Sequence, residues 1–268
     1  AHQNPIEVTA LYAVTRKRRA SGLDPGILAE PTPAAKSAIA AVEQEMHLPA
    51  EQALQTKVIA GDSPAATILK EVRRGYSLLV LGATDRRSPG SLFNAVVDQV
   101  IQDAPCPTMI VKSSLGYTAG GTAPLICQRL NHILVPTSGT EPSRYALEVA
   151  SAFAAQTGAL ITLLYVINQP QYEFFLFEEQ TLSTAMEMGR QILDLQSAIA
   201  IQLGARVQPR ILEGLPEREI LNFAQTEDVD LIVLGTSVRM MTGRVFFGHR
   251  VDAILNKAIC PVALLSVP

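Results

Sequence analysis

The chain has 268 residues, of which 48% are hydrophobic and 18% are charged, and its formal net charge is −3. This composition can form a packed core, and the length suits two domains of about 110–140 residues. The small acidic excess argues against a nucleic-acid-binding surface, no apolar run reaches the roughly 18 residues of a membrane span, and no signal peptide is visible.

The first half of the chain predicts alternating strands and helices. Pro64 takes the first helical position after a turn, and Gly75 ends that helix. The basic run Thr15–Arg19 is interpreted as a solvated loop, with a contact to phosphate or acidic lipid as the alternative. The expected elements are strands at Ile6–Val14, Leu54–Ile59, 78–82 and Thr108–Lys112, and helices at Ala34–Met46, Pro64–Arg74 and Ala95–Asp103.

The second half predicts five strands with a helix between each successive pair. Ala146, Ala150 and Phe153 share one face of the first helix, which Gly158 ends. Strict alternation of strands and helices requires a parallel, doubly wound sheet, so the predicted fold class is α/β. The expected strands are a strand from Ile133 that leads into a turn ending at Thr140, then Leu160–Ile167, Val207–Leu212, 231–235 and Val262–Val267, and the expected helices are 139–158, Gln180–Leu203, Pro216–Thr226 and 249–258.

The two halves are copies of one unit. Gly82 recurs as Gly235 after 153 residues, and past the next loop Cys106 recurs as Cys260 after 154 residues. A constant offset of this kind indicates duplication, with one extra residue in the loop of the second copy. We therefore expect two doubly wound, parallel five-stranded sheets.

The first copy lacks its first strand and first helix in this sequence. The first strand of the second copy begins 28 residues before Ile161, and the matching position in the first copy lies before Ala1. That strand is central in a doubly wound sheet, and its loss leaves backbone groups unpaired on both neighbours. We expect the missing piece to lie upstream, or another segment or partner chain to fill the gap.

The domain bounds follow from a stretch without periodicity. The glycines and serines of residues 113–131 show no period, so we expect domain 1 at 1–113, a linker at 114–130 and domain 2 at 131–268. The last strand of each copy is apolar and lies at a sheet edge, so the two copies are expected to pair with each other through these strands, with a homodimer as a further expectation. The apolar run Phe174–Phe177 covers core or forms a docking patch for a partner or a membrane domain.

Cys106, Cys127 and Cys260 are interpreted as small core residues. Two of them precede proline at equivalent positions of the copies. The chain has no Cys-x2-Cys pair and no histidines at ligand spacing, so we expect neither a disulfide nor a metal site, which suits a reducing cytoplasm.

The end of the second copy carries the feature typical of ligand binding in α/β sheets. An apolar strand ends at Gly235, and Gly248 then leads into a helix. Backbone N–H groups and the positive end of such a helix attract phosphate.

These motifs resemble the universal stress protein family. The resemblance rests on ILVPTSGTEPSRYALEVASAFA, DLIVLG, VFFGH and AICPVALLSV in the second copy, and on LLVLG and APCPTMIV in the first. More narrowly, ILVPTSGTEPSR, KEVRRGYSLLVLGATDRR, LFN and FFGH resemble the cytoplasmic C-terminal regions of bacterial monovalent cation/proton (Na+/H+) antiporters. That likeness implies a cytoplasmic module with a membrane transport domain upstream.

The resemblance also implies an adenine-nucleotide site, from which both copies depart. Members that bind ATP carry Gly-x2-Gly-x9-Gly-(Ser/Thr) and an aspartate after the first strand. In the second copy Val238 replaces the second glycine, His249 replaces the final Ser/Thr, and Ser138 stands at the aspartate position. The candidate nucleotide-binding residues are Thr137, Ser138, Val166, Gly235, Arg239, Arg244, Gly248 and His249, and the alternative is a vestigial loop kept for packing.

The first copy departs further from the motif. Asp85 replaces the second glycine and would repel phosphate, while Asn94 and Ala95 replace the final pair. We expect no nucleotide in this copy. The ligand of the second copy stays open between ATP, AMP and a cyclic dinucleotide.

The function predicted from these patterns is a non-catalytic regulatory module of an antiporter. The alternative is a freestanding tandem universal stress protein that binds ATP or AMP or docks to a protein. Catalysis is disfavoured because the chain lacks Gly-x4-Gly-Lys-(Ser/Thr), an acidic magnesium cluster and a Ser/His/Asp set. His249 and Asp252 lie three residues apart, a spacing that is commonly a surface contact.

Overall fold

The computed structural model describes residues 7–15, 55–83, 93–112, 130–168, 179–237, 239–241 and 244–267. The chain divides into two compact units, Ala1–Gly75 and Tyr76–Pro268. The predicted linker lies outside the described residues, so the predicted domain bounds stay a prediction. Also outside them lie the predicted helix at Ala34–Met46, the basic residues Arg16–Arg19, the run Phe174–Phe177, Asp85 and Cys127.

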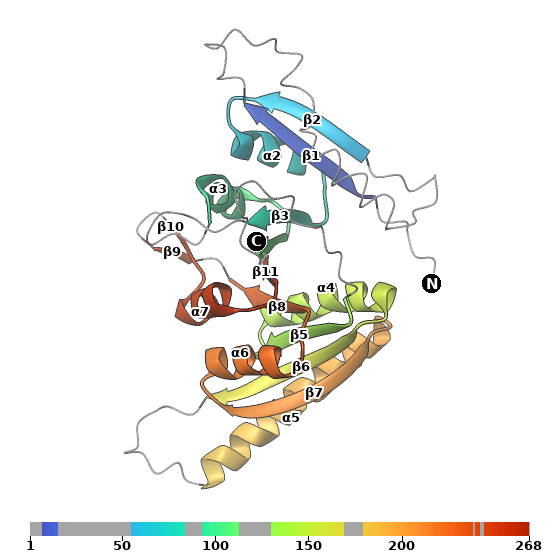
Figure 1. Cartoon of the computed structure of the whole chain (residues 1–268), viewed down its shortest axis with the longest axis vertical. Helices are drawn as coiled ribbons and strands as arrows, with labels where there is room; N and C mark the ends of the chain where they lie inside the picture. The colour runs from blue at the N-terminus through green and yellow to red at the C-terminus, as the bar shows by residue number, and fades with distance from the viewer. Residues whose placement is uncertain are drawn as a thin grey trace. The chain divides into compact units, whose positions relative to one another are not determined.

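The first unit contains two parallel strands and a helix (Figure 1). They are β1 (Thr9–Thr15), β2 (Gln55–Gly61) and α2 (Pro64–Val72). The Ser63 side chain caps α2 by accepting from the Ala66 N–H at 3.1 Å, and Pro64 begins the helix as predicted. The inner face of α2 buries Glu71, whose carboxylate lies 2.8 Å from the Lys57 ammonium on β2 and 3.2 Å from the Arg74 guanidinium. This ion pair joins α2 to β2.

The second unit contains one seven-stranded sheet in the order β3-β4-β11-β8-β5-β6-β7. Its strands are β3 (Leu79–Ala83), β4 (Thr108–Lys112), β5 (His132–Thr137), β6 (Leu160–Asn168), β7 (Arg206–Gly214), β8 (Leu231–Thr236) and β11 (Val262–Ser266). Its helices are α3 (Ala95–Asp103), α4 (Glu141–Thr157), α5 (Glu179–Gln202), α6 (Pro216–Thr226) and α7 (His249–Lys257).

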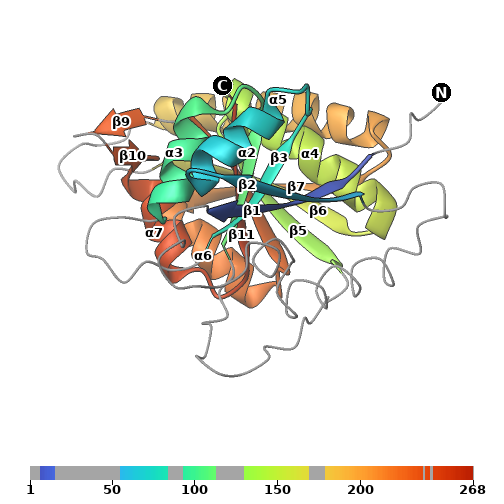
Figure 2. The same ribbon diagram turned by 90° about the horizontal axis from the view of Figure 1, so that it is seen from above.

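The helices cover both faces of this sheet, which confirms the predicted α/β fold. One core cluster joins the sheet to α3, α6 and α7, and the other joins it to α4 and α5. Figure 2 separates these two helical layers, seen from above. Alternate strand residues supply the two cores, as where Leu134 enters the first cluster and Ile133 and Val135 enter the second.

The second copy forms the predicted five-stranded parallel sheet, in the order β7-β6-β5-β8-β11. The loop after β8 additionally contains an antiparallel hairpin, β9 (Arg239–Met241) with β10 (Arg244–Phe246), which the sequence analysis did not predict. Long apolar side chains around this loop account for the difference, because Val245 packs against the core and Phe247 is buried in it.

The two copies are joined by β4 and β11, which pair as predicted, and the pairing is antiparallel. Ile110 lies opposite Leu264, and these residues are 154 positions apart, so they are equivalent in the two copies. Equivalent residues facing each other are the mark of a two-fold, isologous interface. A duplicated unit thus forms within one chain the interface that a symmetric dimer forms between two.

A pair of phenylalanines repeats this symmetry above the sheet. Phe93 and Phe247 are equivalent residues, and their rings meet edge to face with centroids 5.8 Å apart. Both side chains are buried in the same core cluster. Each copy therefore contributes the same aromatic residue to a shared core.

Lys112 breaks the symmetry of the interface. Its side chain is buried, and its ammonium donates a 2.8 Å hydrogen bond to the carbonyl oxygen of Leu255 in the last turn of α7. That end of a helix carries partial negative charge. The equivalent residue of the second copy is Ser266, so only the first copy holds its partner's helix in this way.

Asp252 lies on α7, which packs against α6. Its Oδ1 atom is buried and accepts no hydrogen bond from the described residues. Burial raises the pKa of this carboxyl above its ordinary value, and the nearby His249 opposes the shift only in part. The folded chain therefore holds a proton on Asp252 more tightly than the unfolded chain does.

The Lys112→Met substitution removes the charged donor while it keeps an apolar stem. We expect the free energy of unfolding to fall by about 1.5–3 kcal/mol, the range for a hydrogen bond from a charged group. Urea denaturation measures this change. The exposed Lys257→Met at the end of α7 is the matched control and should change the value by less than about 0.5 kcal/mol. Equal losses in the two variants would contradict the assigned contact.

The Asp252→Asn substitution should stabilise the chain at pH 7. Because the folded-state pKa is raised, ionisation of Asp252 opposes folding, and stability falls as pH rises from the ordinary Asp value of about 3.9 through the raised one. Urea denaturation at pH 7 and near pH 4 should show an advantage for the asparagine variant that shrinks at the lower pH. An advantage independent of pH would contradict this reasoning, and Asp194→Asn on the exposed face of α5 controls for the amide.

Candidate functional site

The candidate residues lie at the carboxyl edge of the sheet of the second copy. Thr137 ends β5, Val166 lies near the end of β6, and Gly235 lies near the end of β8. Since these three strands are parallel and adjacent, the loops after them emerge at one edge. This edge is where ligands bind in open α/β sheets.

The loop between β5 and α4 is held by its own hydroxyl groups. Thr137 is buried, donates to the Ser143 hydroxyl at 3.1 Å and accepts from the Gly139 N–H at 3.1 Å. The Ser143 hydroxyl donates in turn to the Thr140 carbonyl at 2.8 Å. Thr137 therefore shapes the loop, while the exposed Ser138, 3.1 Å from the Thr140 hydroxyl, presents the polar group on its outer side.

Gly235 is required by packing against α4. A Cβ atom on this residue would collide with the carbonyl oxygen of Pro142 and would lie 2.6 Å from the Ser143 nitrogen. Both atoms belong to the backbone of the first turn of α4, which cannot move aside. Gly235 therefore allows α4 to pack closely against β8, and the sequence motif did not predict this role.

Gly248 opens the N-terminus of α7. It adopts φ 100° and ψ 149°, a backbone conformation that favours glycine, and a Cβ atom there would meet nothing within 4 Å. No side chain caps this helix among the described residues. The first N–H groups of α7 therefore have no side-chain acceptor among the described residues.

The equivalent helix of the first copy is closed by its own side chain. Asn94 stands where the second copy has Gly248, and its Oδ1 atom accepts from the N–H groups of Val96 and Val97 at 3.1 and 3.0 Å. These are the groups that an anion would use. The two copies thus differ at the N-cap position: Asn94 caps α3 with its side chain, and Gly248 leaves the first N–H groups of α7 without a side-chain cap.

His249, Arg239 and Arg244 surround Gly248 in the chain. The exposed His249 packs its ring edge to face against Phe246, with centroids 5.1 Å apart. Arg239 and Arg244 begin the two strands of the hairpin, and their side chains lie outside what the structure describes. The hairpin brings both arginines into the segment that leads to α7.

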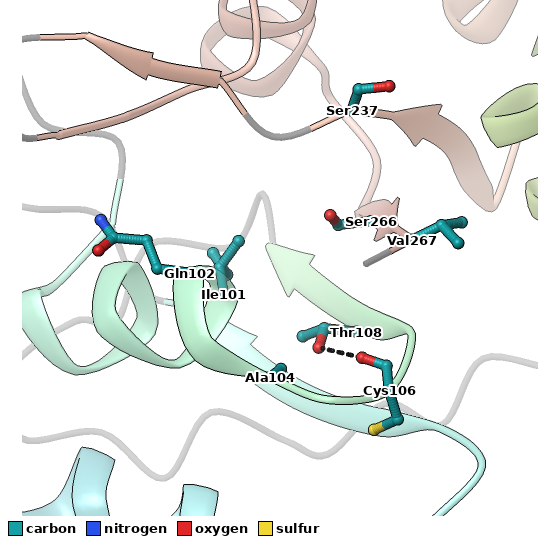
Figure 3. A pocket seen from close by; sticks show the side chains of 8 residues that line it. All are labelled: Ile101, Gln102, Ala104, Cys106, Thr108, Ser237, Ser266 and Val267. Atoms are coloured by element: carbon teal, nitrogen blue, oxygen red, sulfur yellow. Dashed lines mark hydrogen bonds between the residues drawn. The ribbon is translucent and has the colours of Figure 1, made fainter.

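A cavity of about 430 Å³ lies at the seam of the two copies (Figure 3). Thr108 of β4 and Ser266 of β11, which pair with each other, both face it, and the Thr108 hydroxyl donates to the Cys106 carbonyl at 3.3 Å. None of its described lining residues is charged. Residues of both copies line the cavity, so the sequence of either copy alone does not predict it.

Cys106 and Cys260 are both buried, which confirms the prediction that they are small core residues. Cys106 and Cys260 are free thiols, and burial raises the pKa of each. A protonated thiol is a poor nucleophile and a poor metal ligand. Among the described residues, no three His, Cys, Asp or Glu side chains gather in a way that could hold a metal ion, and none of the described helices is long and apolar enough to cross a bilayer.

Sequence comparison relates about half of the chain to each of three relatives. It is 30% identical to a universal stress protein of Thermus aquaticus over 134 residues, which are 50% of this chain and 96% of that one. It is 28% identical to a universal stress protein of Methanocaldococcus jannaschii over 139 residues, 51% of this chain and 82% of that one. A Na+/H+ antiporter of Synechocystis is 23% identical over 137 residues, 50% of this chain and 19% of the antiporter.

Structural comparison extends the likeness to the whole chain. A universal stress protein of Archaeoglobus fulgidus superposes with a TM-score of 0.60 and 19% identity, covering 96% of this chain and 86% of that one. The model of the universal stress protein family matches residues 1–112 and again 129–266. The chain therefore belongs to the universal stress protein family, of which it carries two copies in tandem.

Proposed function

We propose that this chain is a non-catalytic regulatory module whose second copy binds the phosphate of an adenine nucleotide at the N-terminus of α7. The observation that carries the proposal is the contrast between Gly248 and Asn94. The first leaves its helix end uncapped, and the second fills the same place with its own side chain.

The chemistry of this helix end suits an anion. The first N–H groups of a helix carry partial positive charge, and a phosphate that bridges them satisfies donors that no side chain of the described residues caps. Gly248 has no side chain to obstruct that approach. The His249 ring next to it adds a hydrogen-bond donor, and the sequence puts Arg239 and Arg244 in the preceding hairpin.

The surroundings favour binding without chemistry. The described residues that follow the site are Arg250, Val251 and Asp252, and the carboxyl of Asp252 has its Oδ1 atom buried. The Thr137 hydroxyl at the end of β5 donates to the Ser143 hydroxyl in the first turn of α4. A bound nucleotide would then act as a signal.

We further propose that the module works on the cytoplasmic side of a monovalent cation/proton antiporter, in the cytoplasm and attached to a membrane domain. The relative named as a Na+/H+ antiporter supports this context, and its match covers 19% of that protein. A nucleotide regulates such a transporter if it binds one of its conformations more tightly than the other. A freestanding role is the second candidate, supported by relatives that the chain matches over 82% and 96% of their lengths.

The test exchanges the cap between the copies. In Gly248→Asn, the backbone at this position must turn from φ 100°, ψ 149° to the φ −80°, ψ 159° of Asn94, and the new side chain can then accept from the N–H groups of α7. We expect calorimetric titration of the unmodified chain with ATP and AMP to give one site per chain, and Gly248→Asn to weaken binding at least tenfold. Thermal unfolding should show that the variant is folded.

The reciprocal variant is the matched control. Asn94→Gly uncaps α3, which should lower the free energy of unfolding by a few tenths of a kcal/mol and leave nucleotide affinity unchanged. Unchanged affinity in Gly248→Asn would refute the proposed site. If the unmodified chain binds neither ATP nor AMP, the proposal of a nucleotide site is refuted, and protein docking is left as the role of the module.

A further inference from the structure

The cavity at the seam of the two copies corresponds to a place that a lysine side chain occupies on the other side of the seam. Ser266 lines the cavity, and its equivalent in the first copy is Lys112. Ile101 also lines it, and its equivalent is Leu255, whose carbonyl oxygen accepts from the Lys112 ammonium at 2.8 Å. All of the described lining residues belong to the second unit. One side of the seam therefore has a buried lysine where the other side has a serine and a cavity (Figure 3).

The last turn of α3, beside the cavity, has a carbonyl group that the helix itself cannot satisfy. A helical hydrogen bond to the Ile101 carbonyl would come from the residue four positions on, which is Pro105 and has no N–H group. The C-terminal end of a helix carries partial negative charge and is stabilised by a cation. Lys112 and Lys257 supply cations to α7, whereas the last turn of α3 has no basic residue and carries Asp103 at the position equivalent to Lys257.

The described wall of the cavity adds hydroxyl oxygens that can accept hydrogen bonds. The Thr108 hydroxyl donates its proton to the Cys106 carbonyl at 3.3 Å, so its oxygen can still accept from a ligand. The hydroxyl groups of Ser237 and Ser266 also line the cavity, and each can accept. Thr108 and Ser266 are only 2% and 5% exposed. A group with several N–H donors and one positive charge suits this wall, and the buried Lys112 shows that the equivalent place accommodates such a group.

We propose that this cavity binds a primary alkylammonium ion. Its N–H groups would donate to the carbonyl oxygens at the C-terminal end of α3 and to the hydroxyl groups of Thr108 and Ser266. Its carbon chain would lie against Ile101 and Val267, which are apolar lining residues.

The volume of the cavity suits a chain of the length of a lysine side chain, which has four carbons and one nitrogen. Five non-hydrogen atoms need about 150 Å³ if each takes the roughly 30 Å³ of a water molecule, and the cavity measures about 430 Å³. None of the lining residues is among those proposed to bind the nucleotide. The two proposals can therefore fail separately.

Titration of the full chain with n-butylammonium chloride tests the site. At pH 7 and constant ionic strength, the amide NMR signals of Cys106, Thr108 and Ser266 should shift and saturate with a single dissociation constant. Two control ligands separate charge from hydrogen bonding: n-butanol has the chain without the charge, and tetramethylammonium has the charge without N–H groups. Both should bind at least tenfold more weakly. Failure of n-butylammonium to saturate these shifts, or equal binding of either control ligand, would overturn the proposal.

Exchanging the residues across the seam gives the matched variants. Ser266→Lys supplies an ammonium group from the chain and should weaken n-butylammonium binding at least tenfold. Ser183→Lys adds the same charge on the exposed face of α5 and should leave the affinity unchanged. Lys112→Ser creates the equivalent cavity at the end of α7, so this variant should bind two n-butylammonium ions.

Thermal unfolding should show that each variant is folded. Unchanged affinity in Ser266→Lys, or only one bound ion in Lys112→Ser, would overturn the proposal. If a variant does not fold, the titration of the unmodified chain against the two control ligands decides.

Discussion

The antiparallel pair of β4 and β11 is the interaction on which the rest of the second unit depends. It places Ile110 against Leu264 and so sets equivalent residues of the two copies face to face. Without this pair, β4 and β11 would each present an open apolar edge to solvent. With it, Phe93 and Val97 of the first copy join Phe247 and Ile254 of the second in one core.

Two copies fused in one chain are free to differ in a way that two identical subunits are not. Lys112 reaches the C-terminal end of α7, while Ser266 stands at the equivalent place in the other copy. Asn94 closes the start of α3, while Gly248 leaves the start of α7 open. Both differences concern α7. Lys112 of the first copy binds the C-terminal end of this helix, and Gly248 of the second copy leaves its N-terminal end without a side-chain cap.

Much of this arrangement is predictable from the sequence, because it follows from the periodicity of apolar residues and from the constant spacing between equivalent residues of the two copies. The constant spacing between the copies predicts the duplication, and apolar final strands predict that β4 and β11 pair. The cap at Asn94, the packing of Gly235 and the reach of Lys112 depend on which backbone atoms lie nearby in three dimensions. Glycine in a phosphate-binding motif and glycine beneath a helix look identical in one sequence, so only the contact with Pro142 distinguishes them.

Gly82 shows why that distinction matters. A glycine inside a strand costs roughly 0.5–1 kcal/mol relative to alanine, because it loses more conformational freedom on folding and has no side chain to pack. At Gly235 the cost is offset by the close packing of α4 that the missing side chain permits. At Gly82 nothing within 4 Å offsets it. The same residue in equivalent strands is therefore compensated in one copy and uncompensated in the other.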